Sequence, residues 1–128
     1  MKKKIINTIS APAPIGPYSQ AVMAGKTLFV SGQIALNSVT GNLVNESIEA
    51  ETKQVMQNIE AILLASDMNF TNIVKTTIFL TDMNNFATVN QVYGSYFSSD
   101  FPARETVEVS RLPKDVNVEI SVIAAEID

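Results

Sequence analysis

A segment with helical periodicity lies between runs of alternating apolar and polar residues, and this arrangement limits the fold more than any other feature of the chain. Between Glu46 and Ser66, apolar side chains recur every three or four residues, as on one face of a helix. Several glutamates occupy the first turns of this segment, where the helix dipole favours negative charge. We therefore predict a helix from about Asn45 to Ser66.

The alternating runs on either side of this helix predict strands, because successive side chains of a strand point to opposite faces of a sheet. The Gly25-Lys26 pair predicts a two-residue hairpin turn between two of these strands. We expect strands over residues 4–7, 21–24, 27–31, 72–81, 104–109 and 116–124.

A second helix is predicted over roughly Met83–Phe97, after Asp82, which is a good N-cap residue. The order is then strands, helix, strand, helix and two strands. This order predicts one α+β domain over residues 1–128, with both helices packed on one face of the sheet.

The last two predicted strands each carry a charged residue among apolar neighbours. If the apolar side chains of both strands pack beneath the helices, Arg104 and Glu119 share the opposite face. No helix is available to cover that face, but an oligomer interface would cover it and place both charges in a partly dry cleft. A guanidinium and a carboxylate there can bind a small carboxylate and move a proton beside it. The pattern alone favours a structural ion pair or two solvated charges.

Four further residues occupy positions where a ligand could be contacted. Tyr18 follows the proline-rich residues 11–17 directly, and Ser31 and Gly32 end a predicted strand, where glycine leaves its backbone N–H unshielded. Asn90 interrupts the apolar stripe of the second helix. Each has a structural alternative: a packed tyrosine with a satisfied hydroxyl, an ordinary strand end, and a helix residue bonded to a loop.

The composition excludes several classes of function. Histidine and cysteine are both absent, which removes disulfides, thiolate nucleophiles, Ser-His-Asp relays and the usual zinc sites. Acid–base chemistry must therefore use Asp, Glu, Lys, Tyr, the backbone or water. A net charge of −4, with no basic patch beyond Lys2–Lys4, disfavours nucleic acid as a partner.

The same composition bears on association and location. Only 17% of the residues are charged, which favours self-association of so small a domain. No apolar run approaches the roughly 18 residues of a membrane span, and no apolar region of a signal peptide follows the N-terminal lysines. We therefore expect a cytoplasmic protein without a membrane partner.

Four stretches together resemble one known family. They are IGPYSQA (15–21), VSGQI (30–34), IVKTTIFLTDMNNFATVNQVY (73–93) and FPARETVEVSRLPKDVNVEI (101–120). They are similar to the RidA/YjgF/UK114 family, and the resemblance runs essentially from end to end. It implies a chorismate-mutase-like α+β fold, with a mixed sheet and two helices on one face. It also implies assembly as a homotrimer with clefts between subunits.

The resemblance further implies 2-iminobutyrate/2-iminopropanoate deaminase activity, without a metal or an organic cofactor. The substrates are reactive imine and enamine products of pyridoxal-phosphate enzymes, and the products are 2-oxo acids and ammonia.

Individual residues match functional positions of the family. Arg104 is similar to the arginine that clamps the substrate carboxylate, a bidentate role suited to a planar guanidinium. Glu119 resembles the carboxylate that orients or activates the attacking water. The Gly32 N–H would help hold the substrate carboxylate, and the Thr106 carbonyl would help hold the water. The positions matched to the pocket lining are Tyr18, Ser31, Gly32, Asn90 and Thr106.

Two residues depart from the family pattern. Thr106 stands where many members have cysteine, so any thiol-based regulation would be lost, whereas a role of its backbone would survive. Glu105 stands where a small or apolar residue is usual. By alternation it faces away from Arg104, so its effect would fall on packing.

The resemblance also alters the expected strand order. The sequence alone suggests that the last two strands form a hairpin, with Thr106 opposite Glu119. The family sheet instead places the strand Ile73–Thr81 between them. The two backbones are then separated by two strand spacings, roughly 10 Å, which leaves room for a four-carbon imino acid and a water. The sequence leaves open which subunit supplies each wall of the cleft.

Two other functions compete with the deaminase. The first is a non-catalytic protein that binds small metabolites such as 2-oxo acids; the presence of Glu119 argues against it, because simple binding needs the arginine alone. The second is a ribonuclease or translation inhibitor, which an acidic chain without histidine supports poorly.

Overall fold

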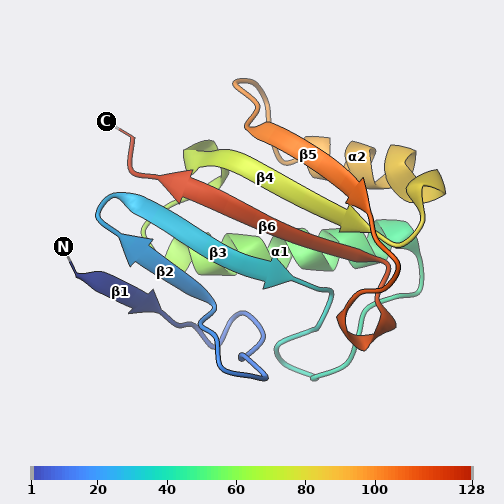
Figure 1. The fold of residues 1–128 in the computed structure, drawn as a ribbon, viewed down its shortest axis with the longest axis horizontal. Helices are drawn as coiled ribbons and strands as arrows, with labels where there is room; N and C mark the ends of the chain where they lie inside the picture. Colours follow the sequence, from blue (N-terminus) through green and yellow to red (C-terminus); the bar gives the residue numbers. More distant parts are fainter. Residues whose placement is uncertain (1, 128) are drawn as a thin grey trace.

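One mixed β-sheet forms the frame of the molecule, and two helices lie behind it in Figure 1. In the computed structural model, which describes residues 2–127, the sheet has six strands in the order β1-β2-β3-β6-β4-β5. Neighbouring strands are antiparallel except β4 and β5, which are parallel. The strands are β1 (Lys3–Ile6), β2 (Ala21–Ala24), β3 (Thr27–Gln33), β4 (Ile73–Leu80), β5 (Ala103–Glu108) and β6 (Val118–Ala125). The predicted α+β class is confirmed.

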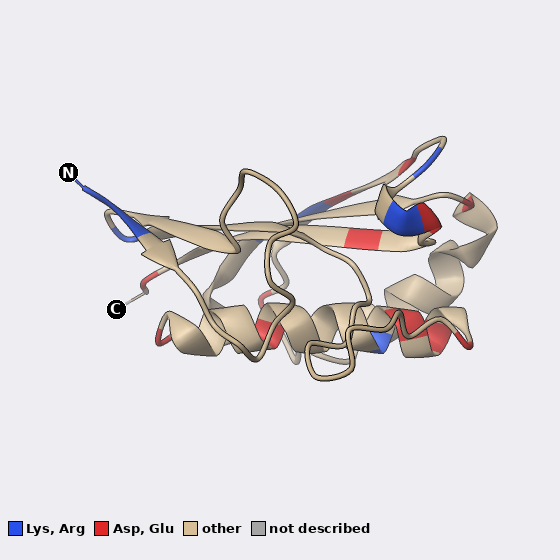
Figure 2. Ribbon diagram, turned by 90° about the horizontal axis from the view of Figure 1, so that it is seen from below, with Lys and Arg blue, Asp and Glu red and all other residues tan. Residues whose placement is uncertain are grey.

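Both helices cover the same face of the sheet, as predicted (Figure 2). Helix α1 (Ile48–Ala65) begins after Ser47, whose Oγ accepts a hydrogen bond from the Ala50 N–H at 3.0 Å. Its apolar stripe packs on the sheet and forms the centre of the core. The largest fully buried apolar side chains of the core are Leu28, Val55, Met56, Ile59, Ile62, Leu63, Ile78, Leu80, Val89 and Ile120.

The second helix is shorter than predicted. Asp82 does act as a cap, but the turn that it caps is the 3₁₀ segment Met83–Asn85, and its side chain accepts a hydrogen bond from the Asn84 N–H. Helix α2 (Phe86–Gly94) follows and ends three residues before the predicted end. It connects β4 to the parallel strand β5, the type of crossover that parallel pairing requires.

Strand β4 lies between β5 and β6, so the strand order implied by the family resemblance is confirmed and the predicted hairpin of the last two strands is wrong.

The strict alternation of inward and outward side chains also fails at one end of β4. The register with β6 shifts between Ile73 and Lys75, which turns Val74 out to solvent and buries Ile73 instead. A bulge of this kind inserts one residue and so reverses the faces before it.

Strand β3 also differs from its prediction, because it continues beyond Ser31 through Gly32 to Gln33. Its register with β6 shifts between Val30 and Gln33.

None of the helices within residues 2–127 has the length and apolar character that crossing a membrane would require.

Candidate active site

The sheet register places Arg104 and Glu119 on opposite faces, which corrects the shared face predicted from alternation. Arg104 lies beside Thr76 in the β4–β5 pairing, and Glu119 lies beside Phe79 in the β4–β6 pairing. Thr76 is fully buried beneath the helices, whereas Phe79, three residues further along β4, points to the uncovered face. Arg104 therefore faces helix α2, and Glu119 faces away from both helices.

The prediction failed because it assigned the apolar side chains of β5 to the core. β5 is the edge strand of the sheet, and Val107 is 42% exposed on the uncovered face. Glu105 shares that face and lies 3.3 Å from Lys75 in an ion pair, so it does face away from Arg104 as expected.

Helix α2 holds the Arg104 guanidinium in a defined position. The Nη1 group donates a hydrogen bond to Asn90 Oδ1 at 2.6 Å. The guanidinium carbon lies 5.6 Å and 5.4 Å from the ring centroids of Phe86 and Tyr93, within the range of cation–π attraction. The Tyr93 hydroxyl in turn donates to Thr76 Oγ1 at 2.9 Å, and burial raises the pKa of this tyrosine. The guanidinium is thus fixed on one side while its side chain remains exposed.

Thr106 lies two residues after Arg104 on the same face of β5. Its Oγ1 atom is buried, and within residues 2–127 it has no hydrogen-bond partner. We call Arg104, Asn90 and Thr106 the arginine wall. Three of the seven predicted site residues therefore gather at the edge of the sheet beside α2.

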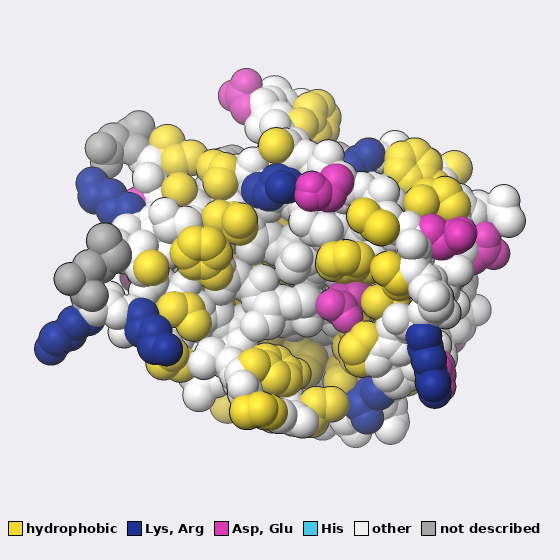
Figure 3. Space-filling view, in the orientation of Figure 1, with side chains coloured by type: hydrophobic (Ala, Val, Ile, Leu, Met, Phe, Trp, Pro, Cys, Tyr) yellow, Lys and Arg dark blue, Asp and Glu magenta, His cyan; other side chains and the backbone are white. Residues whose placement is uncertain are grey.

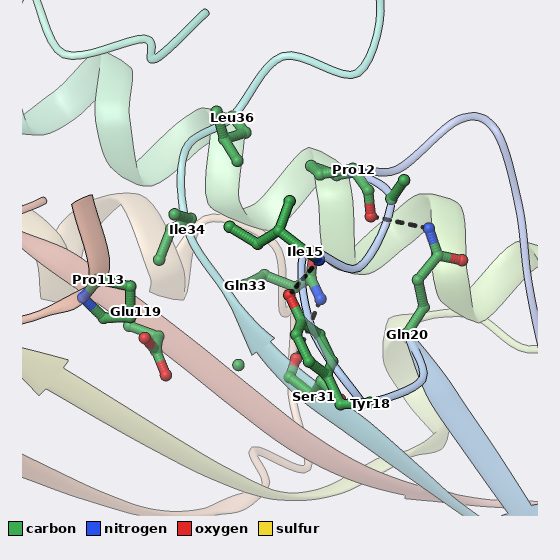
Figure 4. Close-up of a pocket in the computed structure, with 12 residues that line it drawn as sticks. Pro12, Ile15, Tyr18, Gln20, Ser31, Gln33, Ile34, Leu36, Pro113 and Glu119 are labelled. Atoms are coloured by element: carbon green, nitrogen blue, oxygen red, sulfur yellow. Dashed lines mark hydrogen bonds between the residues drawn. The ribbon is translucent and has the colours of Figure 1, made fainter. Parts of the chain in front are cut away.

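The other four predicted residues, Tyr18, Ser31, Gly32 and Glu119, line one pocket of about 390 Å³ (Figure 4). We call these four residues the glutamate wall. They come from the proline-rich segment, from β3 and from the start of β6. Within the described part of the chain, Glu119 is the only charged residue that lines this pocket.

The Glu119 carboxylate lies directly against the backbone of Gly32. A Cβ atom added to Gly32 would come within 2.8 Å of the Glu119 carboxyl carbon and would collide with one carboxylate oxygen. Glycine is therefore required at this position for the close approach. Burial raises the pKa of the Glu119 carboxyl above its ordinary value, because the pocket removes water from the charged form.

Ser31 and Tyr18 make local hydrogen bonds that shape the pocket. The Ser31 hydroxyl donates to the Ser19 carbonyl at 2.6 Å, so its proton is already used within the chain. The Tyr18 hydroxyl accepts a weak hydrogen bond of 3.4 Å from the Ile15 N–H, and the side chain is half exposed. Within residues 2–127 the Tyr18 hydroxyl has no acceptor, so it can donate a hydrogen bond to a ligand.

Sequence reasoning missed Gln20, which organises the proline-rich segment around the pocket. Gln20 is buried, and its Nε2 donates to the carbonyls of Thr8, Ala11 and Pro12 at 2.9, 3.2 and 2.9 Å. Its Oε1 accepts from the Thr8 N–H at 2.7 Å. The signal was present, since Gln20 is polar and stands within the IGPYSQA stretch, next to a predicted strand.

Sequence reasoning also missed the apolar part of the pocket. Several large apolar side chains face the space beside Glu119 (Figure 4). They are Pro12, Ile15, Ile34, Leu36 and Pro113. Across residues 2–127, no group of three or more Asp and Glu side chains is placed to hold a metal ion.

Comparison with known proteins gives the family. Residues 8–126 match the family described as Endoribonuclease L-PSP. The chain is 52% identical to a RutC family protein of Pyrococcus horikoshii, over 95% of this chain and 97% of that protein. It is 49% identical to the 2-iminobutanoate/2-iminopropanoate deaminase of Bos taurus, over 97% of this chain and 90% of that protein.

Solved structures agree with the sequence matches. A putative endoribonuclease of Thermotoga maritima superposes with a TM-score of 0.96 at 45% identity, covering 100% of both chains. TdcF of E. coli, solved with bound serine, gives a TM-score of 0.93 at 41% identity, covering 97% and 99% of the two chains. The fold therefore defines a YjgF-like α+β domain. The chain belongs to the RidA/YjgF family, as its sequence motifs predicted.

Proposed function

We propose that this protein hydrolyses 2-imino acids such as 2-iminobutyrate and 2-iminopropanoate, with their enamine tautomers, to 2-oxo acids and ammonia. Mammalian relatives with 45–49% identity carry the name of this activity. The observation that carries the proposal is the state of Glu119: a carboxylate of raised pKa, in a pocket to which the described chain contributes no cation. Such a group takes up a proton more readily than a fully solvated carboxylate does.

Each complete site requires two copies of the chain. Arg104 and Glu119 point to opposite faces of one sheet, so a single chain does not present both to one small substrate. We place the arginine wall of one copy against the glutamate wall of its neighbour. The two walls are different surfaces, so the contact is heterologous, and such contacts form a ring when the rotation between copies closes. The family resemblance indicates three copies in that ring.

The uncovered face of the sheet supports this assembly. It carries exposed apolar side chains, including Phe29 at 48% and Val107 at 42% exposure, and Figure 3 shows apolar groups spread across it. Exposed apolar area of this kind marks an interaction surface. The Lys75–Glu105 ion pair lies on the same face and would be enclosed with it.

In the proposed mechanism, Arg104 binds the substrate carboxylate through two parallel N–H groups, and the Gly32 N–H adds a third donor. Asn90 and the rings of α2 keep the guanidinium oriented before substrate arrives. Tyr18 and Ser31 line the opposite side of the pocket. The reacting carbon of the imine is thereby turned toward Glu119.

Glu119 then takes a proton from a water that the Thr106 carbonyl also holds, and the water oxygen bonds to the imine carbon. Glu119 passes this proton to the imine nitrogen, which becomes an amine on a tetrahedral carbon. Glu119 then takes the proton of the hydroxyl on that carbon and gives it to the leaving amine as the C–N bond breaks. Ammonia and a 2-oxo acid are released, and the carboxylate is restored.

The test generates 2-iminobutyrate with threonine dehydratase and lets semicarbazide compete for the imine. The protein is expected to speed the appearance of 2-oxobutyrate and to lower the yield of semicarbazone. If imine disappears no faster than in buffer, the deaminase proposal is wrong.

A non-catalytic role in binding small metabolites is the second candidate. TdcF, which shares the fold, was solved with serine bound, and this supports a site for small amino-acid-like molecules. Binding of 2-oxobutyrate by calorimetry without any acceleration of imine loss would favour this candidate. The ribonuclease named in the family description is not proposed, because the chain carries a net charge of −4 and has no histidine.

A further inference from the structure

Glu51 is a buried carboxylate that the proposed mechanism does not use. It lies in the first turns of α1, where the sequence suggested only a favourable interaction with the helix dipole. In the structure its side chain is fully buried, and it reaches the start of β6 instead. Its Oε2 accepts hydrogen bonds from the N–H groups of Asn117 and Val118 at 2.8 and 3.0 Å. Its Oε1 accepts from Asn117 Nδ2 at 2.9 Å.

The three groups that Glu51 binds immediately precede Glu119. At this end of β6 the sheet supports the strand from one side only. The register with β4 runs to Val118, whereas the register with β3 shifts between Val30 and Gln33 and ends at Ile120. Within residues 2–127, Glu119 therefore has a strand partner on β4 and none on β3. The Glu51 carboxylate supplies hydrogen bonds where the ladder stops.

The chain that leads into β6 is also unusual. Lys114 and Asp115 have φ values of 55° and 56°, in the left-handed region that residues other than glycine rarely adopt. A strained connector is retained only where its surroundings hold it. Glu51 provides such an anchor directly after the connector, between Asp115 and Glu119.

We infer that Glu51 is a positioning residue, which fixes the start of β6 so that the Glu119 carboxylate stands against Gly32 in the pocket. This inference rests on the proposed deaminase function. The side chain of Glu119 is held by contact with Gly32, and the backbone of the two residues before it is held by Glu51 from the opposite side of the sheet. Loss of Glu51 would let the carboxylate move, although Glu51 itself touches no substrate.

The experiment compares Glu51→Ala and Glu51→Gln with a matched control, Asn72→Ala. Asn72 Nδ2 donates to the Ala125 carbonyl at 2.9 Å and so ties down the far end of the same strand. We expect Glu51→Ala to lower imine turnover about 100-fold, because a shift of 1 Å in a reacting group has an effect of this order. Binding of 2-oxobutyrate should change less than about twofold, because Arg104 provides it.

Glu51→Gln keeps an oxygen acceptor for both backbone N–H groups, and a flipped Asn117 amide can meet its new N–H₂ group. It should therefore recover most of the turnover, to within about tenfold of the wild type. Asn72→Ala should lose thermal stability while its turnover stays within about twofold of the wild type. Equal turnover in Glu51→Ala and Asn72→Ala at equal loss of Tm would overturn the inference.

A second measurement is independent of catalysis. The Glu119 carboxyl is titrated by carbon-13 NMR in each variant, and its pKa should move in Glu51→Ala but stay at the wild-type value in Asn72→Ala. If the wild type lacks imine turnover, the deaminase proposal fails and this titration alone decides the role of Glu51. If Glu51→Ala does not fold, Asn117→Ala is measured in its place. Its turnover should be about threefold or more below that of the wild type. Wild-type turnover in both Asn117→Ala and Glu51→Gln would then refute the inference.

Discussion

The arginine wall and the glutamate wall prepare their charged groups in opposite ways. Arg104 is surrounded by partners: an amide oxygen accepts from it and two aromatic rings flank it, yet its side chain stays exposed. Glu119 is half-buried among apolar side chains, against the bare backbone of Gly32, and its pKa is raised by the loss of water. In the proposed mechanism, one wall orients a charge for binding, and the other destabilises a charge for reaction.

This difference follows from the elements that build each wall. The arginine wall lies on an edge strand beneath a short helix, where long polar side chains reach solvent. The glutamate wall lies at a bulge of β3, where glycine permits close contact and a proline-rich segment excludes water. A binding group tolerates exposure because bidentate geometry selects its ligand. A proton-transferring group needs a pKa shifted toward the working pH.

The largest effect is expected from removing the guanidinium. Arg104→Ala should lower imine turnover by at least about 1,000-fold and abolish detectable binding of 2-oxobutyrate, since the substrate carboxylate loses its bidentate partner. Arg104→Lys should recover little, because an ammonium lacks the planar fork. Lys53→Ala, which removes an exposed cation of α1, is the control and should behave as the wild type. Normal affinity of Arg104→Ala for 2-oxobutyrate would show that the arginine wall is not part of the binding site.

The second prediction separates binding from reaction. Glu119→Gln should reduce turnover by about 100-fold or more, the usual contribution of a general base, while 2-oxobutyrate affinity changes little. Calorimetry and the semicarbazide assay on one preparation give both values. Equal losses of affinity and turnover would mean that Glu119 contributes to binding, which contradicts the proposal that Arg104 binds the substrate and Glu119 transfers the proton.

Mixing the two inactive variants tests whether the walls come from different copies. When Arg104→Ala and Glu119→Gln chains are unfolded and refolded together, about one quarter of the sites should combine a wild-type arginine wall with a wild-type glutamate wall. Turnover should recover to about that fraction of the wild type. No recovery, with mixed oligomers demonstrated by mass spectrometry, would show that both walls belong to one chain.

A smaller effect is expected from filling the space above Gly32. Gly32→Ala places a methyl group where the Glu119 carboxylate lies, so the carboxylate must move and turnover should fall about 10- to 100-fold. Gly94→Ala is the matched control, because a Cβ there meets no atom within 4 Å. A crystal structure of Gly32→Ala with the carboxylate unmoved would contradict the proposed cause.

The smallest effect concerns stability. Because the folded-state pKa of Glu119 is raised, the folded protein binds more protons than the unfolded chain between the two pKa values. The contribution of Glu119 to the free energy of unfolding is therefore most favourable below the pKa of the group in the unfolded chain. It decreases as pH rises through the pKa of the group in the folded protein. Glu119→Gln should raise Tm by about 1–2 °C at pH 7, and the gain should vanish near pH 4. A gain that persists unchanged at pH 4 would exclude burial of the charge as its cause.

Much of this protein could be predicted from its sequence. The period of the apolar residues located both helices and all six strands to within a few residues, except that α2 begins as a 3₁₀ turn and ends early. The motifs around Arg104 and Glu119 identified the family, and the resemblance to that family implied that β4 lies between β5 and β6. The helices, the strands and the motifs depend on local spacing or on residues adjacent in the chain.

Only the tertiary structure decided which residues stand together. The alternation of apolar and polar residues shows that neighbouring side chains of a strand point to opposite faces, but it does not show which face the helices cover. On the edge strand β5, the face that carries Arg104 turned toward helix α2. Bulges in β3 and β4 reversed the alternation of inward and outward side chains, and the pattern of apolar residues did not reveal them. The contact of Glu51 with Asn117 spans 66 residues, so no local pattern reveals it. Arg104 and Glu119 were visible in the sequence; their separation by a sheet was settled by strand order, register and the position of the helices.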